Sequence, residues 1–247
     1  MKLAYHAVGA LAAFVASPAL ADCSSLPDYG ALQKALTASV KPTGGPSNGG
    51  LDLNMWATTV DRDGVVCVVT MSGKDRGDQW PGSRVISAQK ANTANAFSLD
   101  GFALSTANLF SAVQPGGSLY GLQASNPVDT AAAYGGTSAD YGSANDPLKG
   151  KKVGGVNVFG GGLALYKDKK VIGAVGVSGD TSCADHNVAW RVRKALGLDA
   201  VPGGVNPAKN DGIIYDIGVL GKSKGGFGHP TCGGKEASVA ASIGSGK

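Results

Sequence analysis

Two histidines are the side chains in this sequence best suited to acid–base chemistry or to binding a metal ion. The chain has three histidines, and His6 falls in an N-terminal segment that we expect to be removed. His186 lies within a helix predicted to start after Asp180, and His229 lies in a glycine-rich stretch. Each is interpreted either as an ordinary structural residue or as a metal ligand, and both interpretations stay open.

The sequence contains no recognisable nucleophile motif. Ser178 sits between Val177 and Gly179, without the leading glycine of a G-x-S-x-G elbow. The glycine run at 160–162 lacks the Lys-Ser/Thr of a phosphate-binding loop and the helix that must follow it. Because no set of nucleophile, base and orienting group is visible, we predict a protein without catalysis of its own. A small-molecule enzyme acting on a hydroxy acid or similar metabolite is the weakest of three hypotheses.

Lysine and tyrosine side chains supply further binding candidates. Lys90 lies in a helix predicted over 83–97, whose small residues let a neighbouring element come close. It either extends to solvent or binds an anionic group. An irregular stretch over 114–150 carries three tyrosines, Tyr120, Tyr134 and Tyr141. Such rings can cover a flat ligand or a partner surface, and the alternative is a flexible insert with incidental aromatic residues.

Four cysteines remain after the expected cleavage, namely Cys23, Cys67, Cys183 and Cys232. An even count in an exported chain favours two disulfides. Of the three pairings that four cysteines allow, we favour Cys183 with Cys232 and Cys23 with Cys67. The first bond would tie the C-terminal tail to a helix start, and the second would tie the new N-terminus to a strand. The alternative is a cysteine metal site, against which stands the lack of any C-x-x-C pair.

Residues 1–21 have the pattern of a secretory signal. Lys2 supplies the positive end, the apolar stretch around 11–15 is too short to span a bilayer, and Ala19-Leu20-Ala21 offers a cleavage site. A lipoprotein interpretation of Cys23 is weakened by Asp22, because a lipobox has a small residue there. We therefore predict a mature chain that begins at Asp22 and is periplasmic or secreted.

The composition excludes several classes of partner. The chain has 247 residues and a formal net charge of +4, and its 22 lysines and arginines are scattered, so nothing indicates nucleic acid. Beyond the signal, no apolar run is long enough for a membrane helix. The length suits one core, and the 39 glycines indicate short elements and many loops.

A β-hairpin followed by a helix is the element around which the chain is organised. Two apolar runs at 163–166 and 171–177 alternate and are rich in β-branched residues, which favours strands. Asp180 or Thr181 can then cap a helix that ends at Gly197. The other predicted elements are a hairpin over 53–60 and 65–71 around an Asp-Gly turn, helices over 27–40, 83–97 and 105–113, a short strand over 213–220, and ten frayed C-terminal residues.

The sequence resembles the GlcG/HbpS family of haem-binding-like proteins. The resemblance rests on the segment Gly161-Gly162-Leu163-Ala164-Leu165, followed by the 171–179 run and a helix. It extends to the turn at 61–64 and to a set of residues in the 83–97 helix, namely Ser83, Ala88, Lys90-Ala91 and Thr93-Ala94. The match covers roughly residues 29–197.

The resemblance implies an α/β/α sandwich with an antiparallel sheet of about five strands, assembled as dimers or larger rings. Family members have been linked to haem or related tetrapyrroles, to redox sensing outside the cell and to operons for small-molecule catabolism. We therefore divide the chain into a signal (1–21), a GlcG/HbpS-like domain (22–198) with an insert (114–150), and a C-terminal extension (199–247).

Haem or a related tetrapyrrole is the ligand that the resemblance implies. We expect the ring to lie against the 83–97 helix and the hairpin glycines Gly161 and Gly162, with tyrosines of the insert nearby and Lys90 meeting a propionate. The axial ligand would be His186, His229 or a tyrosine, and the residues do not choose among them.

The chain departs from the family pattern in three places. Members that bind haem can use a histidine of the first helix, and residues 29–40 contain none. The 114–150 insert is longer than the usual connection, and the cysteine-bearing extension is additional. These departures support the alternative hypothesis of an accessory subunit that binds another periplasmic protein through the insert.

Overall fold

The computed structural model describes residues 22–45 and 47–247. The predicted signal at 1–21 lies outside the described residues. Four strands form the sheet, β1 (Trp56–Val60), β2 (Val66–Met71), β3 (Gly162–Lys167) and β4 (Lys170–Ser178). The α-helices are α1 (Tyr29–Val40), α2 (Ser83–Ala96), α3 (Leu122–Ser125), α4 (Thr130–Tyr134), α5 (Ser182–Ala195) and α6 (Glu236–Ile243). Short 3-10 turns lie at Cys23–Ser25, Thr106–Leu109, Ser111–Val113 and Ser138–Asp140.

The sheet is antiparallel throughout, in the order β2-β1-β4-β3. Two hairpins, β1–β2 and β3–β4, are joined through the β1–β4 pair, where Thr58 lies opposite Gly176. The predicted fold class is thus confirmed, with four strands rather than about five. The predicted strand at 213–220 is wrong, because Ile213 and Ile217 form only isolated bridges, to Gly246 and Ser223.

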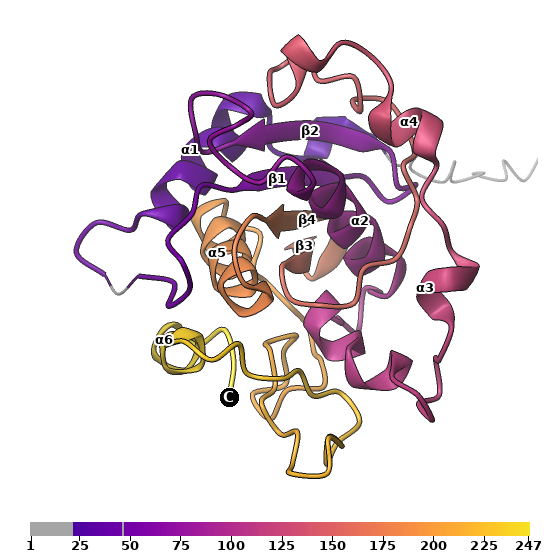
Figure 1. Cartoon of the computed structure of the whole chain (residues 1–247), viewed down its shortest axis with the longest axis vertical. Coiled ribbons are helices and arrows are strands. Elements are labelled where there is room, and N and C mark those ends of the chain that lie inside the picture. The colour runs from indigo at the N-terminus through magenta and orange to yellow at the C-terminus, as the bar shows by residue number, and fades with distance from the viewer. Residues whose placement is uncertain (1–21, 46) are drawn as a thin grey trace, which may run out of the picture.

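Helices cover both faces of the sheet, which makes the predicted α/β/α sandwich. Helices α1 and α5 share one apolar core with one face of the sheet, and α2 shares a second core with the other face. Figure 1 shows α2 in front of the strands, with the segment that carries α3 and α4 along the outside. None of the helices in the described part of the chain is long and apolar enough to cross a membrane.

Glycines let α2 lie directly on the sheet. A Cβ atom at Gly176 would overlap the backbone oxygen of Ser87, and one at Gly162 would overlap that of Lys90. The facing residues of α2 are small and fully buried, among them Ala88 and Ala91. The small residues of α2 thus let the sheet come close, as expected, and the haem position expected against this helix and the hairpin glycines is already filled.

Local hydrogen bonds explain where the elements begin. The carboxylate of Asp28 accepts from the N–H of Ala31 at 2.8 Å and caps α1. Thr181 caps α5 in the same way. In the first hairpin Gly64 adopts φ +77°, as the turn requires, and Asp61 Oδ1 accepts from two N–H groups of the turn.

Two further predictions are corrected by the packing of short segments. The helix predicted over 105–113 is a pair of 3-10 turns, the first closed by a capping box between Ser105 and Asn108. The C-terminal end is not frayed, because α6 buries Val239 and Ala240 and Gly244 ends the helix at φ +78°.

The structure contains the two disulfides that the sequence analysis favours. Cys23–Cys67 ties the start of the described chain to β2, and Cys183–Cys232 ties α5 to the segment before α6. Their sequence separations are 44 and 49 residues. In the chain-entropy picture each closed loop of this size stabilises the fold by about 4 kcal/mol.

Candidate ligand-binding groove

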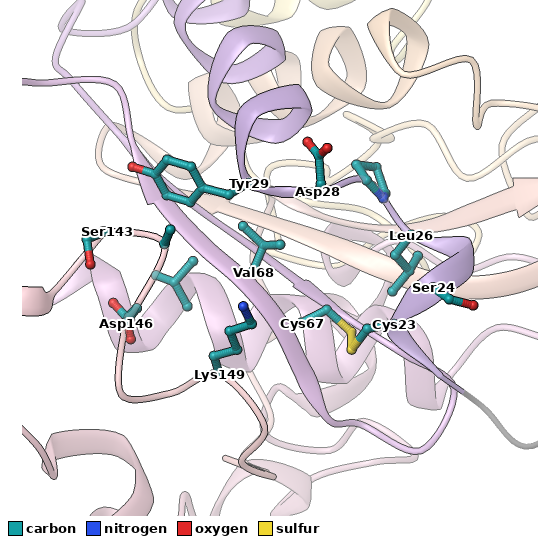
Figure 2. A pocket seen from close by; sticks show the side chains of 13 residues that line it. Cys23, Ser24, Leu26, Asp28, Tyr29, Cys67, Val68, Ser143, Asp146 and Lys149 are labelled. Atoms are coloured by element: carbon teal, nitrogen blue, oxygen red, sulfur yellow. A yellow bond between two sulfur atoms is a disulfide. The ribbon is translucent and has the colours of Figure 1, made fainter.

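Two hollows adjoin at Tyr29, the first residue of α1. The first, of about 300 Å³, lies between the start of α1, strand β2 and the segment that carries Ser143 and Lys149 (Figure 2). The second, of about 550 Å³, is lined by Met71 and Tyr141 among others. Because Tyr29 and Ser143 line both, we treat them together as the α1–β2 groove. Volumes of this size suit small-molecule ligands.

The phenol of Tyr29 is held in place by neighbours on both sides. Its O–H donates to the carbonyl of Gly142 at 2.9 Å, and its oxygen accepts from Gln33 Nε2 at 3.1 Å. Since Gln33 lies one helical turn further along α1, the bond fixes the ring against its own helix. Tyr29 is half-buried, so its oxygen lies at the wall of the groove rather than in the core.

A buried ion pair fixes the other wall of the groove. Arg84 of α2 donates to both carboxylate oxygens of Asp146, through Nε at 2.8 Å and through Nη2. Asp146 also accepts from the N–H of Gly142 at 2.7 Å, and the Arg84 guanidinium lies 3.6 Å from the centroid of the Tyr141 ring. The last part of the insert is therefore bound to α1 and to α2.

The floor of the groove is apolar, and its rim carries cations. Leu26, Val68 and the Cys23–Cys67 disulfide line the first hollow beside the exposed Lys149 (Figure 2). Two further cations, Lys74 and Arg76, line the second hollow and are exposed. Within the described part of the chain, Arg76 pairs with Asp75 at 3.9 Å, and this ion pair is exposed and adds little stability. The exposed Asp28 and Asp75 line the same hollows and offset part of this charge, so the groove offers an apolar surface next to a rim with an excess of cations.

Lys90 lies away from this groove, fully buried beneath the hairpin glycines. Its Nζ donates to Asp185 Oδ2 at 2.6 Å and to the carbonyl of Val177 at 3.1 Å. Asp185 Oδ1 in turn accepts from the N–H groups of Gly179 and Asp180. Lys90 therefore neither extends to solvent nor faces a ligand cavity, and it links α2 to the start of α5.

Burial shifts the pKa values of this ion pair in opposite directions. Loss of hydration lowers the pKa of Lys90, and the Asp185 carboxylate opposes that shift. Burial likewise raises the pKa of Asp185 to about 6, against the influence of Lys90. With hydrogen bonds to the backbone on both partners, the pair acts as a structural tie between two layers.

His186 of α5 is a core residue. It is 0% exposed, and its Nε2 lies 3.1 Å from the carbonyl of Ser245 and 3.2 Å from the N–H nitrogen of Ile213. Its Nδ1 has no partner among the described residues. Burial lowers the pKa of His186 to about 3, so the ring is neutral at neutral pH.

His229 is buried next to the start of α5, beside Ser182 and Cys183. Its Nδ1 lies 2.7 Å from the carbonyl of Pro230, its Nε2 lies 3.4 Å from the nitrogen of Gly160, and its ring is 5.2 Å from that of Phe110. Burial lowers the pKa of His229 to about 4. Neither histidine lines the α1–β2 groove, so the groove gains no imidazole ligand from them.

The structure separates the three tyrosines of the insert. Tyr141 lines the groove, where its O–H lies 3.2 Å from the carbonyl of Tyr134. Tyr120 and Tyr134 are 69% and 63% exposed, and neither lines the groove. Gly161 lies against Lys90 and Asp185, and Gly162 lies against α2.

Sequence reasoning missed most of the groove. Neither Tyr29 nor the cations Lys149, Lys74 and Arg76 are singled out in the sequence analysis. The cap at Asp28 was a usable signal, because it places the next residue at the helix start, where a side chain faces the preceding loop. The pairing of the insert with β2 had no sequence signal.

Several solved structures are similar to this chain. A Klebsiella pneumoniae protein, ORFY, is 26% identical, with a TM-score of 0.46 over 69% of this chain and 90% of that one. PduOC, solved in complex with haem, is 24% identical, with a TM-score of 0.48 over 70% and 94%. HbpS is 15% identical, with a TM-score of 0.42 over 77% and 99%. None of the curated proteins compared with the chain matches it.

The family assignment comes from the sequence itself. A family model described as "Haem degrading protein HbpS-like" matches residues 50–193, more than half of the chain. The matched region runs from just before β1 into α5 and so contains the whole sheet and α2. The resemblance proposed from the sequence is confirmed, and the chain belongs to the HbpS-like family.

Proposed function

We propose that this protein binds haem or a related tetrapyrrole in the α1–β2 groove and performs no catalysis of its own. The observation that carries the proposal is the Tyr29 oxygen at the wall of a groove with an apolar floor and a cationic rim. Membership of the HbpS-like family supports the choice of ligand.

The residues present fit such a ligand. A tyrosine oxygen is an established axial ligand of haem iron, and Tyr29 supplies one at the groove. Leu26 and Val68 offer apolar contact for the ring, and Lys149 offers a positive charge to a propionate. His186 and His229, the histidines considered from the sequence, are buried elsewhere and are not part of the proposal.

The chain's own residues would bind and orient the ligand. A bound haem would supply an iron centre capable of redox change and of binding small molecules. Tyr29 would give up its hydrogen bond to Gly142 when its oxygen binds the metal, while Gln33 would continue to orient the phenol. The Arg84–Asp146 pair would keep the wall formed by the insert in place.

Haemin titration of the purified protein tests this proposal. We expect a shifted Soret band in the wild type and at least tenfold weaker haemin binding in Tyr29→Phe, which retains the ring and loses the oxygen. Tyr134→Phe is the matched control, because Tyr134 is 63% exposed and does not line the groove. Equal affinity in the wild type and Tyr29→Phe would contradict the assignment of Tyr29.

Metal-free protoporphyrin separates the iron ligand from the groove. If Tyr29 acts through iron, Tyr29→Phe should bind this analogue as well as the wild type does. Lys149→Glu should weaken both haemin and protoporphyrin, since it reverses the charge at the first hollow. Absence of any haemin or protoporphyrin binding to the wild type would rule out the proposed function.

We also propose that the protein is exported and works in the periplasm or outside the cell. Two disulfides are typical of oxidising compartments. N-terminal sequencing of the protein recovered from periplasm and medium tests this, with Asp22 expected as the first residue. Recovery of the uncleaved chain in the cytoplasm alone would contradict it.

A further inference from the structure

Two sulfurs and an imidazole meet at the start of α5, apart from the α1–β2 groove. Cys183, Cys232 and His229 bring one ligand atom each within 4.8 Å of one another. Cys183 is the second residue of α5, whereas His229 and Cys232 belong to the C-terminal extension. The two sulfur atoms form the Cys183–Cys232 disulfide, so the cluster is closed by a covalent bond.

The imidazole of His229 faces Cys183 through Nδ1, which lies 3.9 Å from the Sγ atom. Its Nδ1 lies 2.7 Å from the carbonyl of Pro230, which can only accept, so Nδ1 carries the hydrogen and donates. The lone pair is then on Nε2, whose neighbours are the nitrogen of Gly160 and the hydroxyl of Ser182, both at 3.4 Å. Zinc bound at Nδ1 would therefore replace the hydrogen bond to Pro230, and the ring hydrogen would move to Nε2, beside the Ser182 hydroxyl, which can accept it.

We propose that reduction of the Cys183–Cys232 disulfide converts Cys183, His229 and Cys232 into a binding site for Zn²⁺. A dithiol reductant would transfer two electrons and two protons to the disulfide and become a disulfide itself. Binding of Zn²⁺ would then release the two thiol protons to solvent. Two thiolates and one imidazole are a donor set that zinc prefers over harder cations.

The largest movement that zinc binding requires is the separation of the two sulfurs. Thiolates and an imidazole around a tetrahedral zinc ion lie roughly 3.3 to 3.8 Å apart, given bonds of about 2.3 and 2.0 Å. The imidazole Nδ1 already lies 3.9 Å from Cys183 Sγ, whereas the two sulfurs, 2.07 Å apart in the disulfide, would separate by roughly 1.7 Å. Ser182 Oγ, 3.5 Å from Cys232 Sγ, lies next to the fourth position.

A bound ion would preserve the tie that the disulfide makes. Reduction alone would break the covalent link between the extension and α5, and zinc would restore a link between the same two sulfurs. Cys183 is fully buried, whereas Cys232 is only partly buried and follows the exposed Thr231. A reductant can therefore approach the bond from the Cys232 side.

The other disulfide provides an internal comparison. Cys23, Asp61 and Cys67 also bring three ligand atoms within 4.8 Å of one another. Here the third group is a carboxylate, and Asp61 Oδ1 already accepts from the N–H groups of Asp63 and Val65 at 2.9 Å. We expect weaker zinc binding there, because binding would compete with the turn that Asp61 stabilises.

Metal titration of the reduced and oxidised full chain tests the proposal. Co²⁺, a spectroscopic substitute for zinc, should give thiolate-to-cobalt absorption with one ion per reduced chain and none with the oxidised chain. Zn²⁺ should bleach that absorption. No thiolate-to-cobalt absorption in the reduced wild type would overturn the proposal.

Alkylation mapping identifies the sulfurs without any substitution. In the reduced wild type, Zn²⁺ should protect Cys183 and Cys232 from iodoacetamide and leave Cys23 and Cys67 reactive. Protection of Cys23 and Cys67 alone would overturn the assignment. His229→Gln should weaken Co²⁺ binding at least tenfold while Cys23→Ser/Cys67→Ser leaves it unchanged, and equal affinity of His229→Gln and the wild type would refute the role of the imidazole.

Discussion

Lowering the pH from 7 to 5 should destabilise this protein, because it buries two histidines in neutral form. Burial lowers the pKa of His186 to about 3 and that of His229 to about 4, from an ordinary value of 6.5. A histidine with a depressed pKa in the folded state contributes stability that is present above its unfolded pKa. That stability is lost as the pH falls through the window between the two values.

The size of the effect follows from these pKa values. Between pH 7 and pH 5 the loss is about 2 kcal/mol for each histidine. Asp185 acts in the opposite sense, because burial raises its pKa from 3.8 to about 6. Its contribution to folding stability is therefore present at low pH and is lost as the pH rises. Its protonation on going to pH 5 returns about 1 kcal/mol, which leaves a net loss of roughly 2 to 3 kcal/mol.

Urea unfolding of the oxidised protein at pH 7 and pH 5 measures this loss. His186→Gln is the informative variant, because glutamine retains a donor for the Ser245 carbonyl and does not titrate. Its free energy of unfolding should fall by about 2 kcal/mol less than that of the wild type between the two pH values. Equal losses in the wild type and His186→Gln would refute the reasoning, whatever the absolute stability of the variant.

Two substitutions test the packing of α2 on the sheet. Lys90→Met leaves the Asp185 carboxylate buried without its cation and should lower the free energy of unfolding in urea at pH 7 by about 3 to 5 kcal/mol. A loss below about 1 kcal/mol would contradict the structural role of this buried ion pair. Gly176→Ala forces a Cβ against the backbone of Ser87 and should lower the melting temperature. Gly82→Ala is the control, because Gly82 has open space around it and the substitution should leave the melting temperature unchanged. Equal melting temperatures of the two variants would contradict the close approach of α2 to the sheet.

Elements with strong local signals were predictable from the sequence. Both hairpins, α2 and α5 lie within a few residues of their predicted positions, because alternating apolar residues, an Asp-Gly turn and a Thr181 cap specify them locally. The α/β/α arrangement was predicted from the family resemblance. Helix periodicity alone could not predict it, because periodicity does not say which face of a sheet a helix covers.

Elements that depend on distant contacts were not predictable. The apolar run from Ile213 reads as a strand, but its backbone bonds to Ser245 and Lys247 at the chain end and, at Ile214, to His229. Helix α6 is short and forms because it packs on α5, a contact with no local signal.

The candidate site shows the same division. The number of cysteines and their positions favoured the observed disulfide pairs. Such a prediction needs only an even number of cysteines and predicted elements that bring the partners of each pair together. The chemistry of histidine suggested His186 and His229 as metal ligands. Whether a ligand can reach an imidazole depends on its burial in the folded chain, and His186 lies in the core. Tyr29 became a candidate only when the insert was seen to pack on α1.

The two outer strands of the sheet have a consequence for self-association. At β2, the carbonyl of Lys151 and the N–H of Gly150 bond to Val66, and at β3 the N–H of Tyr166 bonds to the carbonyl of Leu198. Open strand edges are templates on which other chains add as new strands. Because irregular segments of the same chain occupy part of each edge, the sheet is interrupted on both sides. Growth of intermolecular β-sheet, the first step toward fibrils, is therefore blocked at these points without the charged or proline-rich edge strands that many proteins use.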